Sequence, residues 1–406
     1  MEDVPNNLKI PLKTNILLFV VTFANFIRYL GLSIIQIGLP DFILNLSGTL
    51  ISYGIVIGAF NATQSIFQFP MAAASDKFGR KIMIIVGIFV YTIGTLLCFL
   101  AQSIVELIIY RAIQGAGAYT SILQAVLGDV YKKEEKGKGM ALYSLSLTLG
   151  YTGIIIGGYI SFYLNFRSIF LINGILAIIS FILIVIFFKS PKNSKETTAR
   201  DVNEKKKRVS FSLNDFKILL KERQYQYAII LNSFRWLCFG GIISYLVWVF
   251  QVHFGLNEIE TSYILIVTIT IYIIFLMITG RLVDRRGTRK MMLIGQIIVI
   301  VFGFLFFIVN ITNNLLIYIF ASLCQAIGFG ILQTAGNTLL LQKIEVINPE
   351  LRGAGLGLGN SIGFMFSAIG PVVLSVLGEF ELFLPYYFII ILTIPCLLIS
   401  LKLIDK

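Results

Sequence analysis

The sequence predicts an all-α membrane protein with twelve transmembrane helices, arranged as two pseudo-symmetric six-helix bundles. Three observations support this fold class. Of the 406 residues, 57% are hydrophobic and only 13% are charged, which is not the composition of a soluble domain. Apolar stretches long enough to cross a bilayer recur along the whole chain. A polar pattern in the first half is repeated in the second half.

The apolar stretches define the expected order of the chain. They cover residues 15–39, 50–74, 82–100, 104–130, 139–163, 167–188, 224–252, 259–282, 291–309, 315–342, 354–378 and 382–401. The gap between the sixth and seventh stretches is polar and basic, as in a solvated linker, and its residues 213–220 have an amphipathic pattern typical of a membrane-surface helix. We therefore expect an N-terminal bundle (1–188), a cytoplasmic linker (189–223) and a C-terminal bundle (224–406).

The positions of the basic residues predict the orientation. The formal net charge is +12, but the Lys and Arg residues lie in short clusters between apolar stretches, not on one nucleic-acid-binding face. Nearly all of them occur in the N-terminus, the even-numbered connections, the linker and the C-terminus. By the positive-inside rule, both termini are cytoplasmic. We expect a monomeric, multi-pass protein of the cell (plasma) membrane that contacts the lipid bilayer and does not bind nucleic acid.

An arginine occurs within the first and the seventh apolar stretch, in the related segments Asn25–Tyr29 and Asn232–Trp236. A rise of about 1.5 Å per residue places both arginines near the middle of the membrane. A charge at that depth costs roughly 3 kcal/mol unless it faces protein, water or a ligand. A guanidinium group can bind a carboxylate or phosphate through two hydrogen bonds. A small organic or inorganic anion is therefore the preferred substrate, with Arg28 and Arg235 as its ligands. The alternative is a structural role, in which the arginines bind helix carbonyl groups.

Other polar residues of the spans complete the predicted substrate site. They recur at helical spacing within the apolar stretches, so they face one side of each helix. They are Asn25, Tyr29, Gln36, Asn61, Gln64, Asn232, Trp236, Gln333 and Asn337.

Two connections share the pattern Asp-x-x-Gly followed by basic residues. It occurs at 76–81, between the second and third spans, and at 284–290, between the eighth and ninth. Glycine allows a tight turn between antiparallel helices, and basic residues keep the turn in the cytoplasm. The fourth span contains Arg-Ala-Ile-Gln-Gly-Ala-Gly at 111–117, and the fifth contains four glycines between 150 and 158.

These motifs resemble those of the major facilitator superfamily, and the resemblance covers the whole chain. It implies a secondary transporter in which two six-helix halves rock around a site at the middle of the membrane. It also implies a latch, with Asp76 at the start of the eleventh span and Arg80 paired with Asp129. The gating and motif residues are Asp76, Gly79, Arg80, Arg111, Asp129, Gly157, Gly158, Asp284 and Gly287. Departures from the family pattern are Ala72, Ile154 and Thr288.

The sequence contains no nucleophile with a nearby base, no metal-ligand cluster and no phosphate-binding loop. We therefore expect no enzyme activity, no cofactor and no metal, but a small-molecule substrate with a coupling proton or counter-anion. Two other functions remain open. One is a multidrug efflux transporter with an apolar cavity, in which the arginines are structural. The other is a non-transporting sensor with a transporter-like fold, although the chain has only the linker as a signalling appendage.

The expected orientation can be tested with introduced cysteines. Ser47→Cys and Glu379→Cys should react with a membrane-impermeant maleimide added to intact cells, because both lie in connections that are poor in basic residues. Lys206→Cys should react only after the cells are permeabilised. Labelling of Lys206→Cys in intact cells would reverse the orientation.

Overall fold

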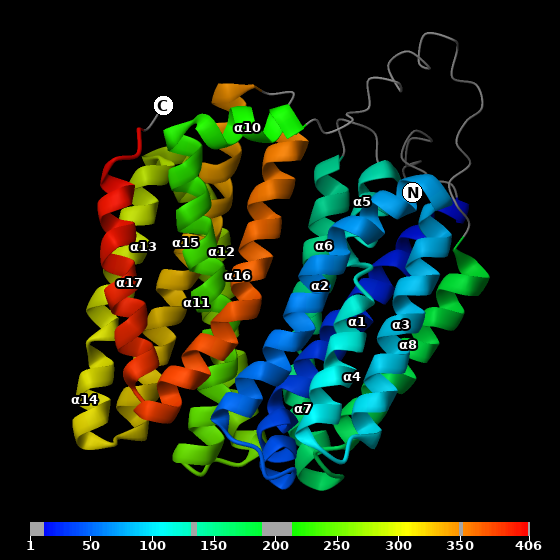
Figure 1. Ribbon diagram of the computed structural model, residues 1–406, viewed down its shortest axis with the longest axis horizontal. Coiled ribbons are helices and arrows are strands. Elements are labelled where there is room, and N and C mark those ends of the chain that lie inside the picture. Colours follow the sequence, from blue (N-terminus) through cyan, green and yellow to red (C-terminus); the bar gives the residue numbers. More distant parts are fainter. Residues whose placement is uncertain (1–11, 131–135, 189–212, 349–351, 405–406) are drawn as a thin grey trace, which may run out of the picture. The chain divides into compact units, whose positions relative to one another are not determined.

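The computed structural model describes residues 12–130, 136–188, 213–348 and 352–404, and every element within these ranges is a helix (Figure 1). The elements are α1 (Leu12–Asn45), α2 (Leu50–Phe78), α3 (Arg80–Leu100), α4 (Ile104–Ala116), α5 (Thr120–Val130), α6 (Lys136–Gly150), α7 (Gly153–Tyr163), α8 (Ser168–Phe187), α10 (Leu213–Lys221), α11 (Arg223–Trp248), η3 (Val249–His253), α12 (Glu258–Arg286), α13 (Thr288–Gly303), α14 (Leu305–Thr312), α15 (Leu315–Ile347), α16 (Arg352–Phe380) and α17 (Leu384–Leu401).

The all-helical membrane fold is confirmed. Among the described residues, eleven helical segments are long and apolar enough to cross a membrane. The fourth expected span, residues 104–130, differs from the sequence-based expectation because it is interrupted: α4 ends at Ala116 and α5 begins at Thr120. A helix is confirmed at the position of the predicted surface helix, as α10, while its place along the membrane surface stays a prediction. Residues 189–212 of the linker lie outside the described part.

The interruption of the fourth span follows from its local sequence. Gly117 ends α4 with φ −72° and ψ 52°, outside the helical region. The backbone then makes two short-range hydrogen bonds, from Ala118 N to the Ala116 oxygen and from Tyr119 N to the Gly117 oxygen. These bonds join residues two apart, as in γ-turns, so they cannot continue an α-helix. A shorter interruption separates α6 from α7 in the fifth span.

The chain groups into two compact units. The first comprises Met1–Gly38 and Ile66–Asn193, and the second comprises Leu39–Ser65 and Ser194–Lys406. The hairpin formed by the end of α1 and the start of α2 therefore belongs with the second unit. The division of the chain into bundles at 188 and 224 stays a prediction.

Close helix contacts in both units depend on small residues. In the first unit, α3 packs on α4 and α8, and a Cβ on Gly94 would lie 2.3 Å from the Gln114 nitrogen. In the second unit, α11 packs along α16, and a Cβ on Gly370 would lie 2.1 Å from the Leu237 carbonyl oxygen. Lipid offers apolar side chains no less favourable surroundings than protein does, so this close packing is a principal source of helix association.

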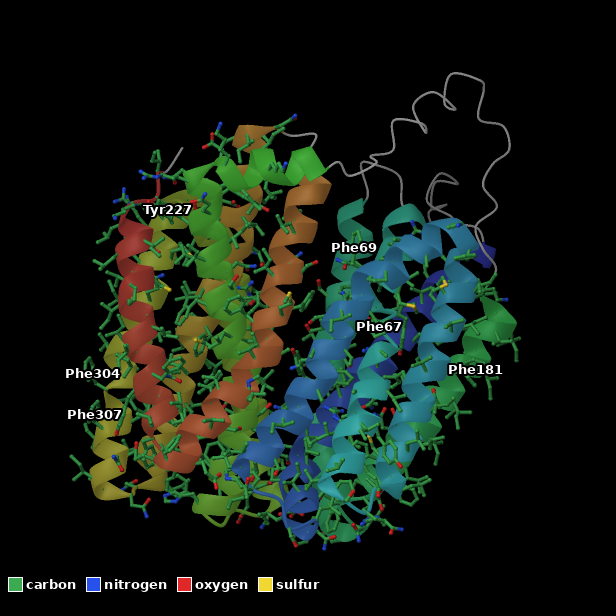
Figure 2. All side chains as sticks on the ribbon, viewed as in Figure 1. Phe67, Phe69, Phe181, Tyr227, Phe304 and Phe307 are labelled. Atoms are coloured by element: carbon green, nitrogen blue, oxygen red, sulfur yellow. The ribbon has the colours of Figure 1, made fainter. Side chains whose placement is uncertain are left out.

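The outward surfaces carry large apolar side chains. Phe181 on α8 and the pair Phe304 and Phe307 beside α14 project from the helices in Figure 2. Phe304 is 54% exposed and Phe307 is 47% exposed. Such exposure is unfavourable in water, but it is the expected contact surface for lipid chains.

The packing of α11 on α16 predicts the effect of enlarging a glycine. Gly370→Val should lower the free energy of unfolding by about 1–3 kcal/mol, because the added atoms overlap the backbone of α11. Gly357→Val on the same helix is the control, since a Cβ there meets nothing within 4 Å. Thermal unfolding of the two purified variants in detergent measures the difference. Equal midpoints would mean that this contact does not limit stability.

Candidate functional site

In the first unit, Arg28 of α1 is enclosed between two tyrosine rings. Its side chain is 0% exposed, and its guanidinium carbon lies 4.5 Å from the centre of the Tyr91 ring and 4.8 Å from that of Tyr119. Its Nη1 donates a hydrogen bond of 3.1 Å to the carbonyl oxygen of Gly117. That carbonyl belongs to the interruption between α4 and α5. This is the contact that a structural role requires, and the role of Arg28 in substrate binding stays a prediction.

The residues beside Arg28 on α1 bind α6. The side-chain amide of Asn25 donates to Ser146 Oγ at 2.7 Å. The hydroxyl oxygens of Tyr29 and Tyr143 are 3.2 Å apart. Asn25 is fully buried. The polar stripe predicted on the first span therefore makes contacts between helices within this unit.

In the second unit, Arg235 of α11 binds two side-chain amides instead of backbone. Its Nη2 donates to Asn232 Oδ1 and, at 3.1 Å, to Asn337 Oδ1 on α15. The amide of Asn232 in turn donates to the Gly359 carbonyl oxygen of α16 at 3.1 Å. Arg235 is 2% exposed, whereas Asn337 is exposed. The structure thus brings together three of the predicted substrate residues from α11 and α15.

Several polar atoms around Arg235 have no hydrogen-bond partner among the described residues. They are Nε and Nη1 of Arg235 and Nε1 of Trp236. A buried donor without an acceptor costs about 1–3 kcal/mol. This polar centre therefore has unused capacity for hydrogen bonding, mainly as a donor.

Covalent geometry limits how Arg235 can bind an anion. The guanidinium group has two edges that can hold an anion through paired hydrogen bonds, Nε with Nη2 and Nη1 with Nη2. Both edges need Nη2, whose two hydrogens face the amide oxygens of Asn232 and Asn337. A paired contact with a carboxylate therefore requires that one of these asparagines move away.

Aromatic rings surround the polar centre of the second unit. The guanidinium carbon of Arg235 lies 4.9 Å from the centre of the Trp236 ring, and that ring is 4.9 Å from Phe364 of α16. Phe239 stacks on Tyr272 of α12 at 5.0 Å. These contacts give the centre a mixed polar and aromatic character.

The other predicted substrate residues are more dispersed. In the second unit, Asn61 of α2 donates to the Ser367 carbonyl oxygen at 3.3 Å, and Gln64 and Gln333 are half-buried. Gln36 is half-buried in the first unit. The structure describes no hydrogen bond that joins these four residues to either arginine.

The turn glycines of the two loop motifs have the conformation that the sequence predicts. Gly79 and Gly287 have φ of 96° and 84°, a region that favours glycine. Asp284 is exposed. The side chains of Asp76 and Asp129 lie outside the described part, so the expected latch with Arg80 stays a prediction.

The motif residues of the fourth and fifth spans make structural contacts. Arg111 donates to Gln114 Oε1 at 2.5 Å. A Cβ on Gly157 would lie 2.5 Å from the Ile34 carbonyl oxygen of α1. Gly158 is also buried. The glycine motif therefore permits close packing against α1.

The residues that enclose Arg28, Tyr91 and Tyr119, do not follow from the sequence patterns described above. Tyr91 is in turn bound by Asn173, which is fully buried and whose amide donates to the Tyr91 hydroxyl at 3.0 Å. Asn173 had a usable signal, because it is an amide in an otherwise apolar span. In the described residues, no group of three or more His, Cys, Asp or Glu side chains could hold a metal ion.

Two helical units with buried arginines and asparagines at membrane depth are features of a membrane transporter. The family model of the Major Facilitator Superfamily matches residues 21–371. The chain therefore belongs to this family of transporters.

Individual relatives are more distant. The chain is 23% identical to an uncharacterized MFS-type transporter of Methanocaldococcus jannaschii, over 86% of this chain and 89% of that protein. It is 23% identical to multidrug resistance protein 2 of Bacillus subtilis, over 91% of each. The match to an uncharacterized transporter of Buchnera aphidicola is 33% identical but covers only 41% of this chain and 43% of that protein.

Solved structures show the same fold. A D-xylose-proton symporter superposes with a TM-score of 0.77 at 15% identity, covering 96% of this chain and 98% of the symporter. A bacterial homologue of the human lysosomal transporter Spinster superposes with a TM-score of 0.75 at 14% identity, covering 97% of each chain. At these identities the similarity concerns the fold alone.

Proposed function

We propose that this transporter carries a small organic anion with a single carboxylate, and that Arg235 is its principal ligand. The observation that carries the proposal is the state of the Arg235 side chain. It is 2% exposed and uses Nη2 for two asparagines, while Nε and Nη1 have no partner among the described residues. An intramembrane cation with unused donors is best explained by a ligand.

The anion enters by replacing Asn337. Asn337 is exposed and holds Nη2 through one hydrogen bond of 3.1 Å. Asn232 is buried and is itself fixed to the Gly359 carbonyl oxygen. When Asn337 turns away, one hydrogen of Nη2 becomes available and completes one of the two edges, with Nε or with Nη1, for a carboxylate. The amide oxygen of Asn337 therefore occupies the position of one anion oxygen in the empty site.

Charge and surroundings favour an organic monoanion. Two basic side chains are buried in the described part of the second unit, Arg235 and Lys343, and Lys343 lies at the end of α15, where it donates to the Ile404 carbonyl oxygen. One guanidinium balances one negative charge. Trp236 and Phe364 next to Arg235 favour an apolar body on the substrate.

Arg28 does not have the same role in this proposal. Its guanidinium lies between two tyrosine rings and binds a backbone carbonyl. The two arginines occupy equivalent places in the sequence repeat, but Arg235 is held by two side-chain amides, one of them exposed, whereas Arg28 donates to the backbone at Gly117. The substrate site is therefore asymmetric.

Binding of named probes tests the proposal. Benzoate and lactate should raise the melting temperature of the purified protein more than succinate or inorganic phosphate do. Arg235→Lys should weaken binding of the better probe by about 1–3 kcal/mol, since the charge remains but the planar edge is lost. Arg28→Lys should keep wild-type affinity. Wild-type affinity of Arg235→Lys, or stabilisation by phosphate and succinate alone, would refute the assignment.

A matched pair of variants tests the exchange of Asn337 for the anion. Asn337→Asp places a carboxylate beside Nη2 and should abolish probe binding, because the protein then supplies its own anion. Asn337→Ser, the control, is too short to hold Nη2 and should bind the probe at least as well as the wild type. Equal binding by both variants would exclude this mechanism.

A second candidate function is multidrug efflux. It is favoured by the match to the multidrug resistance protein of Bacillus subtilis over 91% of each chain. Aromatic side chains near Arg235 would then contact an apolar drug, with the arginine fixed by its asparagines. Cells that express the protein should in that case accumulate less ethidium, and Arg235→Lys should leave this effect intact.

A further inference from the structure

We propose that the interruption between α4 and α5 is a hinge in the fourth span, at which the angle between these two helices changes. Arg28 is its pin, by which we mean the residue that keeps the interrupted segment in place during this change. Arg28 is then a positioning residue for transport, not a substrate ligand. This role requires the transport function of the family but is independent of the anion site at Arg235.

The interruption has the properties of a hinge. Gly117 N still donates to the Gln114 oxygen at 3.3 Å, and the Tyr119 oxygen accepts from Leu123 N at 3.2 Å, but between them Ala118 N and Tyr119 N bond only to residues two positions earlier. Non-helical backbone at membrane depth persists only where protein or water satisfies its polar groups. Arg28 satisfies one of them by donating to the Gly117 oxygen at 3.1 Å. Few local bonds must break when such a segment bends.

The interrupted segment packs closely against α3. A Cβ on Gly117 would lie 2.5 Å from the Gly87 carbonyl oxygen and 2.6 Å from Tyr91 N on α3. A Cβ on Gly87 would lie 2.7 Å from Tyr119 Cβ. The Tyr91 and Tyr119 rings that flank the guanidinium therefore come from the two segments that meet at the hinge. A planar cation between two rings can turn while both contacts are kept.

The next interruption packs on the same part of α1. The fifth span is divided between Gly150 and Gly153. A Cβ on Gly150 would lie 2.5 Å from Tyr29 Cβ, and one on Gly153 would lie 2.3 Å from the Leu30 carbonyl oxygen. Three consecutive residues of the continuous helix α1, 28–30, thus contact the interruptions of two neighbouring spans.

The second unit supplies an internal comparison. Its tenth span, α15, is continuous from Leu315 to Ile347. The equivalent arginine, Arg235, contacts side-chain amides there and no interrupted backbone. Arg28, the arginine that binds a backbone carbonyl, therefore lies in the unit whose fourth span is interrupted. This is expected if it stabilises that interruption.

Hydrogen–deuterium exchange of the purified protein tests the pin. Arg28→Met should raise exchange of the amides at 117–123 by at least about tenfold, the change expected for loss of one hydrogen bond from a charged donor. Arg235→Met, the matched variant of the other unit, should leave these amides unchanged. Should Arg28→Met fail to fold, Arg28→Lys, which keeps one donor but not the planar stack, should give a smaller rise in the same amides. Unchanged exchange at 117–123, or an equal rise throughout α3 and α8, would overturn the proposal.

A distance measurement tests the motion itself. Spin labels at Val105→Cys and Ala125→Cys, on either side of the interruption, should give a broader distance distribution than labels at Phe320→Cys and Leu341→Cys on the continuous α15. Arg28→Met should broaden the first distribution further and leave the second unchanged. A merely structural contact predicts equal widths for both pairs, and that result would refute the hinge. Neither experiment needs a substrate, so failure of the anion proposal would leave both outcomes readable.

Discussion

The cost of leaving polar groups unpaired in a membrane governs this structure. Every buried guanidinium and every interrupted helix turn must find a partner within the protein, because lipid offers none. Arg28 and the carbonyl of Gly117 meet this demand for each other at 3.1 Å. Arg235 meets it only in part, through the oxygens of Asn232 and Asn337. The same constraint thus selects a backbone carbonyl as a partner in one unit and side-chain amides in the other.

This difference supports different proposed roles for Arg28 and Arg235, although the two arginines occupy equivalent positions in the sequence repeat. Both arginines follow an asparagine by three residues and precede an aromatic ring. In the first unit, the ring partners Tyr91 and Tyr119 and a backbone carbonyl surround the charge. In the second, an exposed asparagine is the only described side chain from α15 that binds the arginine. These different surroundings are the basis for the two different roles proposed for the arginines.

Close packing by glycine makes both arrangements possible. Gly117 lets the interrupted segment approach α3, and Gly153 lets the fifth span approach the Leu30 carbonyl oxygen. In the second unit, Gly370 brings α16 against the Leu237 carbonyl oxygen. Helices that approach this closely gain dispersion contacts that compensate for the missing hydrophobic drive in lipid. The positions of the polar centres therefore depend on residues that have no polar side chain.

The sequence by itself determined the membrane class, the ends of most spans, the helix at 213–221 and the transporter family, because apolar length, charge asymmetry and turn glycines are local properties. It also identified Arg28, Arg235, Asn232 and Asn337 as polar residues of interest within the spans. Only the tertiary structure decided which groups they meet. Periodicity does not reveal that the fourth span is broken at Gly117, nor that Tyr91 and Tyr119 enclose Arg28, since these contacts join segments distant in the chain. A local apolar pattern can predict that a residue is buried, but its hydrogen-bond partners depend on how the helices pack.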